Sequence, residues 1–175
     1  MELRTATRSD IPALAGLIEL SGRTLSAGYY TVEQADAITR HVFGVDTELI
    51  DDRTYFAVEH DGQIVACGGW SKRRTLFGGD QTKIGASPLL DPATEPARIR
   101  AFFVHPSMAR RGLGRQLMSA CMAASRQAGF RSLELVSTMP GEPLYKASGF
   151  AVIERFALDL PGGIRVPVCR MGMAI

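Results

Sequence analysis

Residues 109–115 read Ala-Arg-Arg-Gly-Leu-Gly-Arg, and the fold that we expect is built outward from this stretch. It follows an apolar run at 99–104 that is typical of a buried strand, and it opens a segment of helical periodicity that extends to about Ala128. Two glycines at a strand-to-helix junction let phosphate groups approach the backbone closely, because no Cβ stands in the way. The free N–H groups of the first helical turn and the positive end of the helix dipole favour an anion there. The sequence therefore predicts a phosphate-binding strand–loop–helix.

Positive charge is concentrated around this turn, although the chain as a whole is nearly neutral. The formal net charge is only +2, so the whole molecule does not have the composition of a basic nucleic-acid binder. Between Pro96 and Arg115, however, arginine occupies positions 98, 100, 110, 111 and 115, and no acidic residue occurs. We therefore expect a compact anionic ligand and no nucleic-acid partner.

Length and composition indicate one globular domain that spans residues 1–175. The chain is 46% hydrophobic and 22% charged, which argues against disorder. Its cysteines, at positions 67, 121 and 169, are widely spaced and odd in number, as expected for free thiols in a reducing compartment. No apolar signal segment opens the sequence, and no apolar run is long enough to cross a membrane. We expect a cytoplasmic protein with no membrane partner.

Residue patterns along the chain predict a mixture of strands and helices. Asp61-Gly62 between two β-rich runs predicts a hairpin, and Thr31 with Gln34 forms a capping-box pattern at the start of a helix. The unit from Arg98 to Val136 has the pattern of a parallel βαβ crossover. The expected strands lie at about 3–6, 54–59, 63–70, 98–104, 133–136, 151–160 and 164–171, and the helices at about 11–20, 32–43, 112–128 and 143–147.

The segment 71–97 has no clear periodicity. Residues 71–77 are interpreted as an extension of the preceding strand, and glycines and prolines interrupt every pattern after them. A loop of this length in a domain is usually functional or mobile. We interpret the segment as a flap beside the site.

Taken together, these features resemble the GNAT (Gcn5-related N-acetyltransferase) superfamily. The resemblance rests on Ile99-Arg-Ala-Phe-Phe-Val104 followed by His105-Pro106, on the turn Arg111-Gly112-Leu113-Gly114, and on Leu144-Tyr145-Lys-Ala-Ser-Gly149-Phe150. It extends over nearly the whole chain, from Leu3 to Met171. It implies an α/β fold with a mixed, mostly antiparallel seven-stranded sheet, flanked by about four helices and splayed between strands 4 and 5.

The resemblance also implies acetyl-CoA as the acyl-donor cosubstrate, with no metal. The pyrophosphate would lie on the main chain of Arg110 to Arg115, and the pantetheine arm along the fourth strand. Ala109 stands where the family usually has Gln or Arg, and Thr138 where an Asn is common. The implied cofactor-binding residues are Phe102, Phe103, Val104, Ala109, Arg110, Arg111, Gly112, Leu113, Gly114, Arg115 and Thr138.

Transfer of an acetyl group to an amine needs a proton acceptor, stabilisation of an oxyanion and a proton donor. Tyr145 matches the family's proton donor, since a phenol of pKa ~10 stays protonated at neutral pH. A backbone N–H near Val104 would stabilise the oxyanion. Glu95, just before the central strand, is the first candidate for the base. Asp80, Glu59 and a relay through water are alternatives.

The acceptor is expected to be a primary amine of a small molecule or a peptide. Tyr29, Tyr30 and Trp70 are candidates to line its pocket, although aromatic residues at such places more often contribute to packing. A non-catalytic acyl-CoA sensor is the alternative function, and acetylation of aminoacyl-tRNA receives little support from the near-neutral charge. A nucleotide-dependent kinase is disfavoured because no Gly-x-x-x-x-Gly-Lys-Ser/Thr sequence occurs. The identity of the acceptor and the oligomeric state, including a homodimer, stay open.

Overall fold

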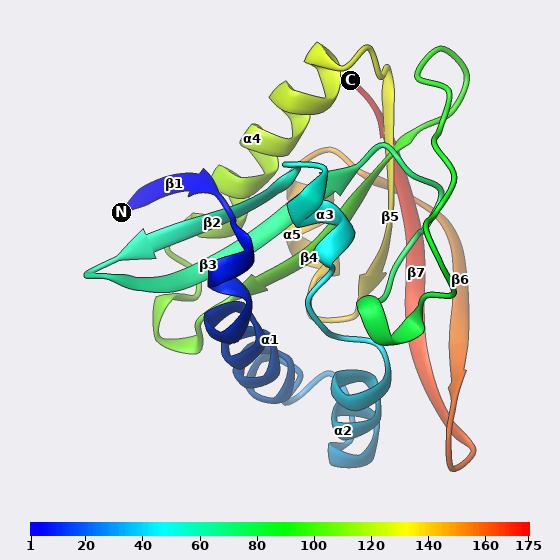
Figure 1. Cartoon of the computed structure of the whole chain (residues 1–175). Coiled ribbons are helices and arrows are strands. Elements are labelled where there is room, and N and C mark those ends of the chain that lie inside the picture. The colour runs from blue at the N-terminus through cyan, green and yellow to red at the C-terminus, as the bar shows by residue number, and fades with distance from the viewer.

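A computed structural model describes residues 1–175, and their strands form one sheet with helices around it (Figure 1). Short 3₁₀ turns at Arg8–Asp10, Asp80–Thr82 and Pro106–Met108 lie between these elements. The strands are β1 (Glu2–Thr5), β2 (Tyr55–His60), β3 (Gln63–Ser71), β4 (Ala97–Val104), β5 (Ser132–Thr138), β6 (Ala151–Leu160) and β7 (Ile164–Ala174). The helices are α1 (Ile11–Leu25), α2 (Val32–His41), α3 (Thr47–Asp51), α4 (Leu113–Gln127) and α5 (Glu142–Ala147).

The sheet has seven strands in the order β1-β2-β3-β4-β5-β7-β6, so β7 lies between β5 and β6. Every neighbouring pair is antiparallel except β4 and β5, which are parallel. These two strands are in register only at Ala97 with Leu133 and at Arg98 with Glu134. Beyond Arg98 they separate, so the mixed, mostly antiparallel sheet with a splay between strands 4 and 5 is confirmed.

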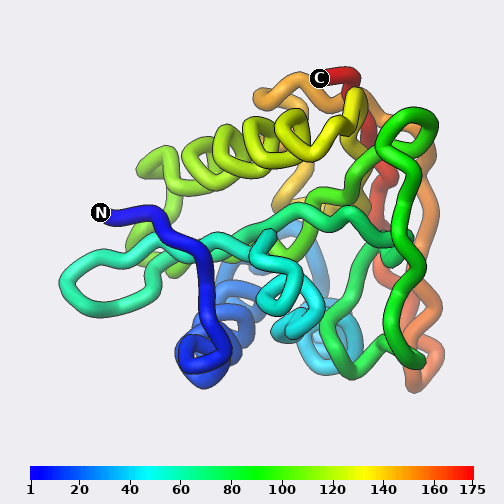
Figure 2. The backbone as a smooth tube through the Cα atoms, turned by 45° about the horizontal axis from the view of Figure 1, so that its top comes forward, coloured from blue at the N-terminus to red at the C-terminus, as the bar shows by residue number.

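Helices cover both faces of the sheet. In Figure 2, α4 lies on one face and α1 on the other. Leu14, Leu17 and Ile18 of α1 form one apolar cluster with Tyr55 of β2, and Leu117 of α4 belongs to another. Burial of apolar side chains on both faces stabilises the central strands.

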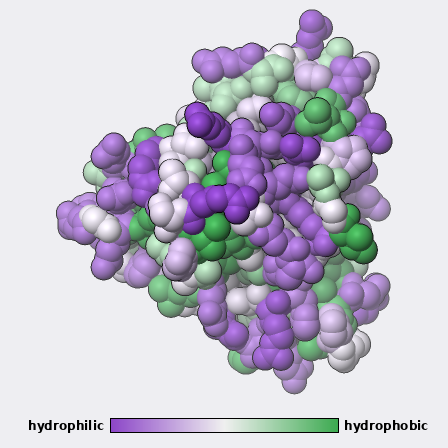
Figure 3. All heavy atoms as spheres, viewed as in Figure 1, coloured by the Kyte–Doolittle hydropathy of each residue, from purple (hydrophilic) through white to green (hydrophobic).

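The surface is consistent with this two-sided core. The face of the molecule in Figure 3 is mainly hydrophilic, and its apolar patches are small and separated by polar side chains. None of the helices is both long and apolar enough to cross a lipid bilayer. The three cysteines are buried and free.

Two local signals in the sequence correspond to the structures that they predict. Asp61 and Gly62 both have positive φ, at 50° and 75°, and connect β2 to β3 as a tight hairpin. At the start of α2, the Gln34 N–H donates to Thr31 Oγ1 at 3.1 Å, and the Thr31 N–H donates to Gln34 Oε1 at 3.0 Å. The capping box is therefore complete.

The expectation for residues 71–97 was only partly correct. Strand β3 ends at Ser71, so residues 72–77 do not extend it.

The short helix α3 was not predicted, and with it the fold has five α-helices rather than about four. Its N-cap is Asp46, whose carboxylate accepts the Glu48 N–H at 3.2 Å. At five residues, α3 is too short for helical periodicity to reveal it.

Candidate active site

The glycines of the turn before α4 serve two different purposes. Gly112 is the N-cap of α4 and has φ = 85°, a left-handed conformation that favours glycine, and a Cβ placed there would meet no protein atom within 4 Å. A Cβ on Gly114 would lie 2.8 Å from Leu144 Cδ2, so this glycine lets α4 approach α5. Only Gly112 keeps the backbone open toward solvent. The expectation that both glycines make room for phosphate is therefore wrong for Gly114, which makes room for α5 instead.

The five arginines around the turn do not form one cluster. Arg98 pairs with Glu134 at 3.2 Å, where both side chains are partly buried, and Arg100 pairs with Asp46 at 2.8 Å in the interior. The other three, Arg110, Arg111 and Arg115, are exposed and make no ion pair. The cationic surface beside Gly112 therefore consists of three arginines, and two ion pairs neutralise the other two arginines that the sequence placed near the turn.

A cavity of about 100 Å³ lies where β4 and β5 separate. Phe102 and Phe103 of β4, Thr138 at the end of β5 and Tyr145 of α5 line it. These four residues were predicted as site residues, and the fold brings them together. Val104 does not line the cavity, and its N–H donates to Ser21 Oγ of α1 at 3.3 Å.

Strand β4 bends beside this cavity. The register of β3 with β4 shifts between Cys67 and Gly69, and Ala101 has φ = 56°, an uncommon value for a residue with a Cβ. A bulge of this kind redirects side chains and backbone groups at the strand edge. Because β5 pairs with β4 only at Ala97 and Arg98, the backbone from Ile99 onward has no β5 partner.

Tyr145 is buried in the wall of the cavity. Its ring packs edge to face against Phe102, with centroids 6.1 Å apart, and against Phe150, with centroids 6.0 Å apart. Burial raises the pKa of the Tyr145 hydroxyl well above its ordinary value. The phenol is therefore protonated at neutral pH, as a proton donor requires.

Glu95 is not brought to the cavity. Its carboxylate accepts the Asp91 N–H at 2.8 Å and lies 3.6 Å from the Arg74 guanidinium, in the turn that precedes β4. The cavity is lined instead by Ile99 to Phe103, toward the other end of the same strand. Glu95, which comes just before β4 in the sequence, therefore lies at the end of the strand that is away from the cavity.

The other two carboxylates considered as bases have structural partners as well. Asp80 accepts the Thr47 N–H at 3.0 Å, and Glu59 accepts from Arg4 Nε at 3.0 Å. Neither lines the cavity, and no carboxylate does. Of the candidates for the proton acceptor, only a relay through water does not require a carboxylate in the cavity lining.

None of the three aromatic residues expected at the acceptor pocket lines the cavity. Tyr29 is 53% exposed. Trp70 is buried against Phe130, with ring centroids 5.9 Å apart. Tyr30 is buried and donates a hydrogen bond to the Pro167 carbonyl at 2.6 Å, while its oxygen accepts the Met139 N–H at 2.9 Å. Tyr30 thus ties the loop before α2 to the segment after β5.

We expect Tyr30→Phe to lower the free energy of unfolding by about 1–3 kcal/mol, because it leaves the Met139 N–H without its partner. Burial raises the pKa of Tyr30 to about 12, in keeping with a neutral hydroxyl that both donates and accepts. Urea unfolding measures the change. The matched control is Tyr29→Phe, which should change stability by less than about 0.5 kcal/mol. Equal stability of the two variants would contradict the structural role of Tyr30.

The segment 72–96 supplies one wall of the cavity, in agreement with a flap beside the site. Leu76, Phe77, Gly78 and Gly79 line it. The Gly79 N–H donates to the Val42 carbonyl at 3.0 Å, which holds the flap against the end of α2. Phe43 and Leu158 complete the wall on this side, and neither was predicted as a site residue.

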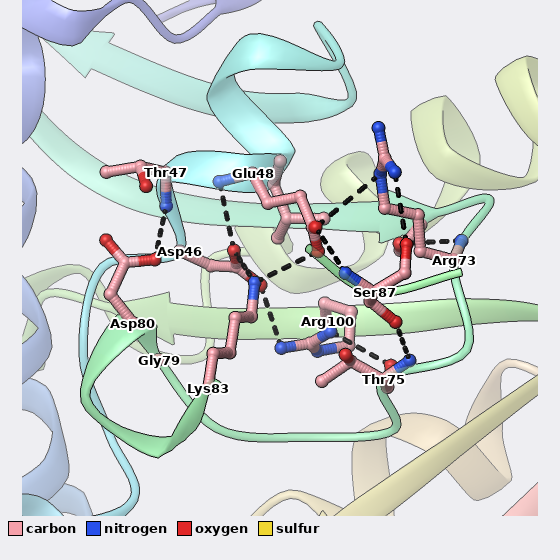
Figure 4. Close-up of polar contacts among 12 residues, drawn as sticks. Asp46, Thr47, Glu48, Arg73, Thr75, Gly79, Asp80, Lys83, Ser87 and Arg100 are labelled. Atoms are coloured by element: carbon pink, nitrogen blue, oxygen red, sulfur yellow. Dashed lines mark hydrogen bonds and ion pairs between the residues drawn. The ribbon is translucent and has the colours of Figure 1, made fainter. Parts of the chain in front are cut away.

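Hydrogen bonds and ion pairs of buried charged groups hold the flap in place (Figure 4). Asp46 accepts hydrogen bonds from Arg100, at 2.8 Å, and from Lys83 of the flap. Arg100 also donates to the flap carbonyls of Gly78, at 2.6 Å, and Thr75, at 2.9 Å. Asp46 and Arg100 are 54 positions apart, so no local pattern in the sequence could have revealed this pair.

Comparisons with known proteins agree with this architecture. The sequence profile described as the acetyltransferase (GNAT) family matches residues 18–150. No curated protein sequence matches the chain. A GCN5-related N-acetyltransferase from Rhodopseudomonas palustris has a TM-score of 0.72 at 17% identity, over 99% of this chain and 95% of the other. The PaiA N-acetyltransferase from Thermoplasma acidophilum, in complex with coenzyme A, has a TM-score of 0.64 at 15% identity, over 99% of this chain and 98% of the other.

A third structural neighbour is the ribosomal-protein-alanine N-acetyltransferase from Brucella melitensis. It has a TM-score of 0.66 at 14% identity, and the alignment covers 100% of both chains. At such low identity, these three likenesses establish a shared fold. The profile covers well over half of the sequence, and its match does not depend on them. The chain therefore belongs to the acetyltransferase (GNAT) family.

Proposed function

We propose that this protein transfers an acetyl group from acetyl-CoA to a primary amine of a small-molecule or peptide acceptor. The observation that carries the proposal is the position of Tyr145, which lines a cavity at the point where β4 and β5 separate. Family membership supplies the class of reaction. Because strands from both ends of the chain form one sheet, we treat residues 1–175 as a single catalytic domain.

The residues present fit acetyl-CoA. The backbone around Gly112 faces open space, and the exposed guanidinium groups of Arg110, Arg111 and Arg115 have no protein partner. Backbone N–H groups at a helix N-terminus, together with arginines, form a suitable site for a pyrophosphate. The edge of β4 that has no β5 partner offers peptide groups to a pantetheine arm in the manner of an added strand.

In direct attack, the chain's own residues act on the departing sulfur and on the carbonyl oxygen. When bound, acetyl-CoA supplies a thioester carbonyl, and the reaction forms a C–N bond and breaks a C–S bond. Tyr145 gives its proton to the departing sulfur and regains one from solvent. Backbone N–H groups of β4 stabilise the charge on the carbonyl oxygen. With no carboxylate in the lining, water accepts the proton that the amine loses.

A non-catalytic acyl-CoA sensor is the second candidate, and the absence of a carboxylate from the cavity lining favours it. The two functions differ in turnover alone. A sensor would bind acetyl-CoA and release no thiol with any amine, whereas an enzyme would do both.

Titration calorimetry with acetyl-CoA tests the proposal first. We expect micromolar binding that weakens with dephospho-CoA, which lacks the ribose phosphate. The double variant Arg110→Ala/Arg111→Ala should lower the affinity at least about tenfold in about 0.1 M salt, since hydrogen bonds to charged groups contribute about 1.5–3 kcal/mol each.

The matched control is Arg126→Ala/Arg131→Ala, which removes the same charge near the other end of α4. It should leave the affinity for acetyl-CoA unchanged within about twofold, because the Debye length of about 10 Å at 0.1 M salt screens distant charges. Absence of binding to either ligand would overturn the acyltransferase proposal. Equal losses in the two double variants would mean that general electrostatic attraction, rather than the turn, holds the ligand.

A further inference from the structure

The acceptor side of the cavity has an apolar lining. Thirteen of the eighteen residues around the whole cavity are hydrophobic. On the side away from Tyr145, the lining comes from α2 and the residues after it, from the flap and from the C-terminal hairpin, namely Ile38, Val42, Phe43, Leu76, Phe77, Leu158 and Val168. An acceptor that reaches Tyr145 from this side must pass apolar walls.

Arg100 is the one charged residue in the lining, and its charge is already balanced. The guanidinium is 3% exposed and lies 2.8 Å from the Asp46 carboxylate. It also donates to two flap carbonyls. An acceptor carboxylate would have to compete with Asp46 for this guanidinium, and the competition would take place in a buried setting where the existing pair is strong.

The apolar wall is held in place by charges that do not reach the cavity. Lys83 of the flap bonds to Asp46 and lies 3.2 Å from Glu48 Oε2 (Figure 4). The Ser87 N–H donates to Glu48 Oε1 at 3.0 Å. Neither carboxylate lines the cavity, so neither is available to a second ammonium group of an acceptor.

We propose that the acceptor is a primary amine carried on an apolar skeleton that bears no second charge. The inference rests on the proposed acetyl transfer and narrows its substrate class. The amine carries the nucleophile to the thioester, and Phe43, Phe77 and Leu158 contact the hydrocarbon part. A second charged group would be buried without a partner, which is strongly unfavourable. Polyamines and amino acids with a free carboxylate are therefore excluded.

Two matched pairs of amines test this class. Hexylamine and cadaverine have the same number of heavy atoms and differ by a methyl against an ammonium group. Phenethylamine and phenylalanine differ only by a carboxylate. In steady-state assays of thiol release, the apolar member of each pair should have about 100-fold higher kcat/KM, since a missing methylene alone changes this ratio by about 10–200-fold.

A substitution in the apolar wall tests whether these residues cause the preference for apolar amines. Phe77→Ala should lower kcat/KM for hexylamine about tenfold and leave the affinity for acetyl-CoA unchanged. The matched control is Ile84→Ala on the same flap, because Ile84 is fully exposed and lines nothing. This control should not change kcat/KM for hexylamine.

Calorimetry with the CoA-loaded protein provides a readout that does not depend on turnover. Hexylamine should bind and cadaverine should not. If cadaverine or phenylalanine binds as tightly as its apolar partner, or if neither apolar amine binds, the inference is overturned. Acetyl transfer to a charged amine would overturn it as well while leaving the proposed function intact. Absence of acetyl-CoA binding, by contrast, would remove the function itself.

Discussion

In Tyr145→Phe we expect kcat for acetyl transfer to fall by about 10²–10⁴-fold, the usual contribution of a positioned general acid. The substitution removes one hydroxyl from the cavity wall and keeps the ring. The edge-to-face packing against Phe102 and Phe150 therefore remains. Affinity for acetyl-CoA should stay within about twofold, because the proton is transferred only when the C–S bond breaks.

The control is Lys146→Ala on the same short helix. Its ammonium pairs with Glu142 at 2.8 Å, its side chain is more than half exposed, and it does not line the cavity. kcat in this variant should remain within about twofold of the parent, since surface ion pairs contribute little. A parental kcat in Tyr145→Phe would mean that water or another group protonates the thiolate. No thiol release in the parent protein would favour the sensor.

The pH dependence gives a second check on the same residue. Because burial raises the pKa of Tyr145 above the ordinary phenol value of about 10, the acid stays protonated as the pH rises toward that value. The rate should therefore rise with pH as the acceptor ammonium loses its proton, and no decrease of the rate should occur up to about pH 10. If kcat of the parent protein decreases as the pH rises toward 10, and kcat of Tyr145→Phe does not, then the Tyr145 phenol has an ordinary or lowered pKa.

The largest loss of stability is expected for Asp46→Asn, at about 3–5 kcal/mol. Asp46 has no exposed surface, and the substitution leaves Arg100 as a buried cation without its counterion. Burial lowers the pKa of Arg100, and the Asp46 carboxylate opposes that shift. Asparagine retains the side-chain oxygen that caps α3, so the loss reports the charge and not the helix cap.

Urea unfolding of Asp46→Asn and of Asp51→Asn provides the comparison. Asp51 pairs with Arg8 on the surface, at 2.6 Å, with both side chains at least half exposed. Its loss should change the free energy of unfolding by less than about 1 kcal/mol. Similar values for the two variants would mean that solvent reaches the Asp46–Arg100 pair and that the flap is not fastened by it.

Local sequence patterns were sufficient for much of the framework. The hairpin at Asp61-Gly62 and the capping box at Thr31 depend on residues a few positions apart, so the sequence contains the whole signal. The crossover from β4 through α4 to β5 is similarly local. Phe102, Phe103, Thr138 and Tyr145 were named from motifs next to these elements, and the fold places all four at one cavity.

The remaining features depend on contacts between distant segments. Glu95 lies two positions before β4, yet the cavity is lined by residues toward the other end of that strand. Arg98 and Arg100 contributed to an apparent cationic cluster, and their partners Glu134 and Asp46 lie 36 and 54 positions away. Charge counted along the sequence takes no account of such pairing.

By itself the sequence determined the glycine turn before α4 and the tyrosine of the cavity, because short motifs specify them. The family resemblance that these motifs support implied the mixed sheet with its splay. Only the tertiary structure decided which arginines remain free, which aromatic residues line the cavity and how the flap is fastened. Those outcomes depend on Asp46, Phe43 and Phe77, which belong to segments with no regular pattern. Their neighbours are set by long-range packing, and burial then determines which charges can be neutralised and which can meet a ligand.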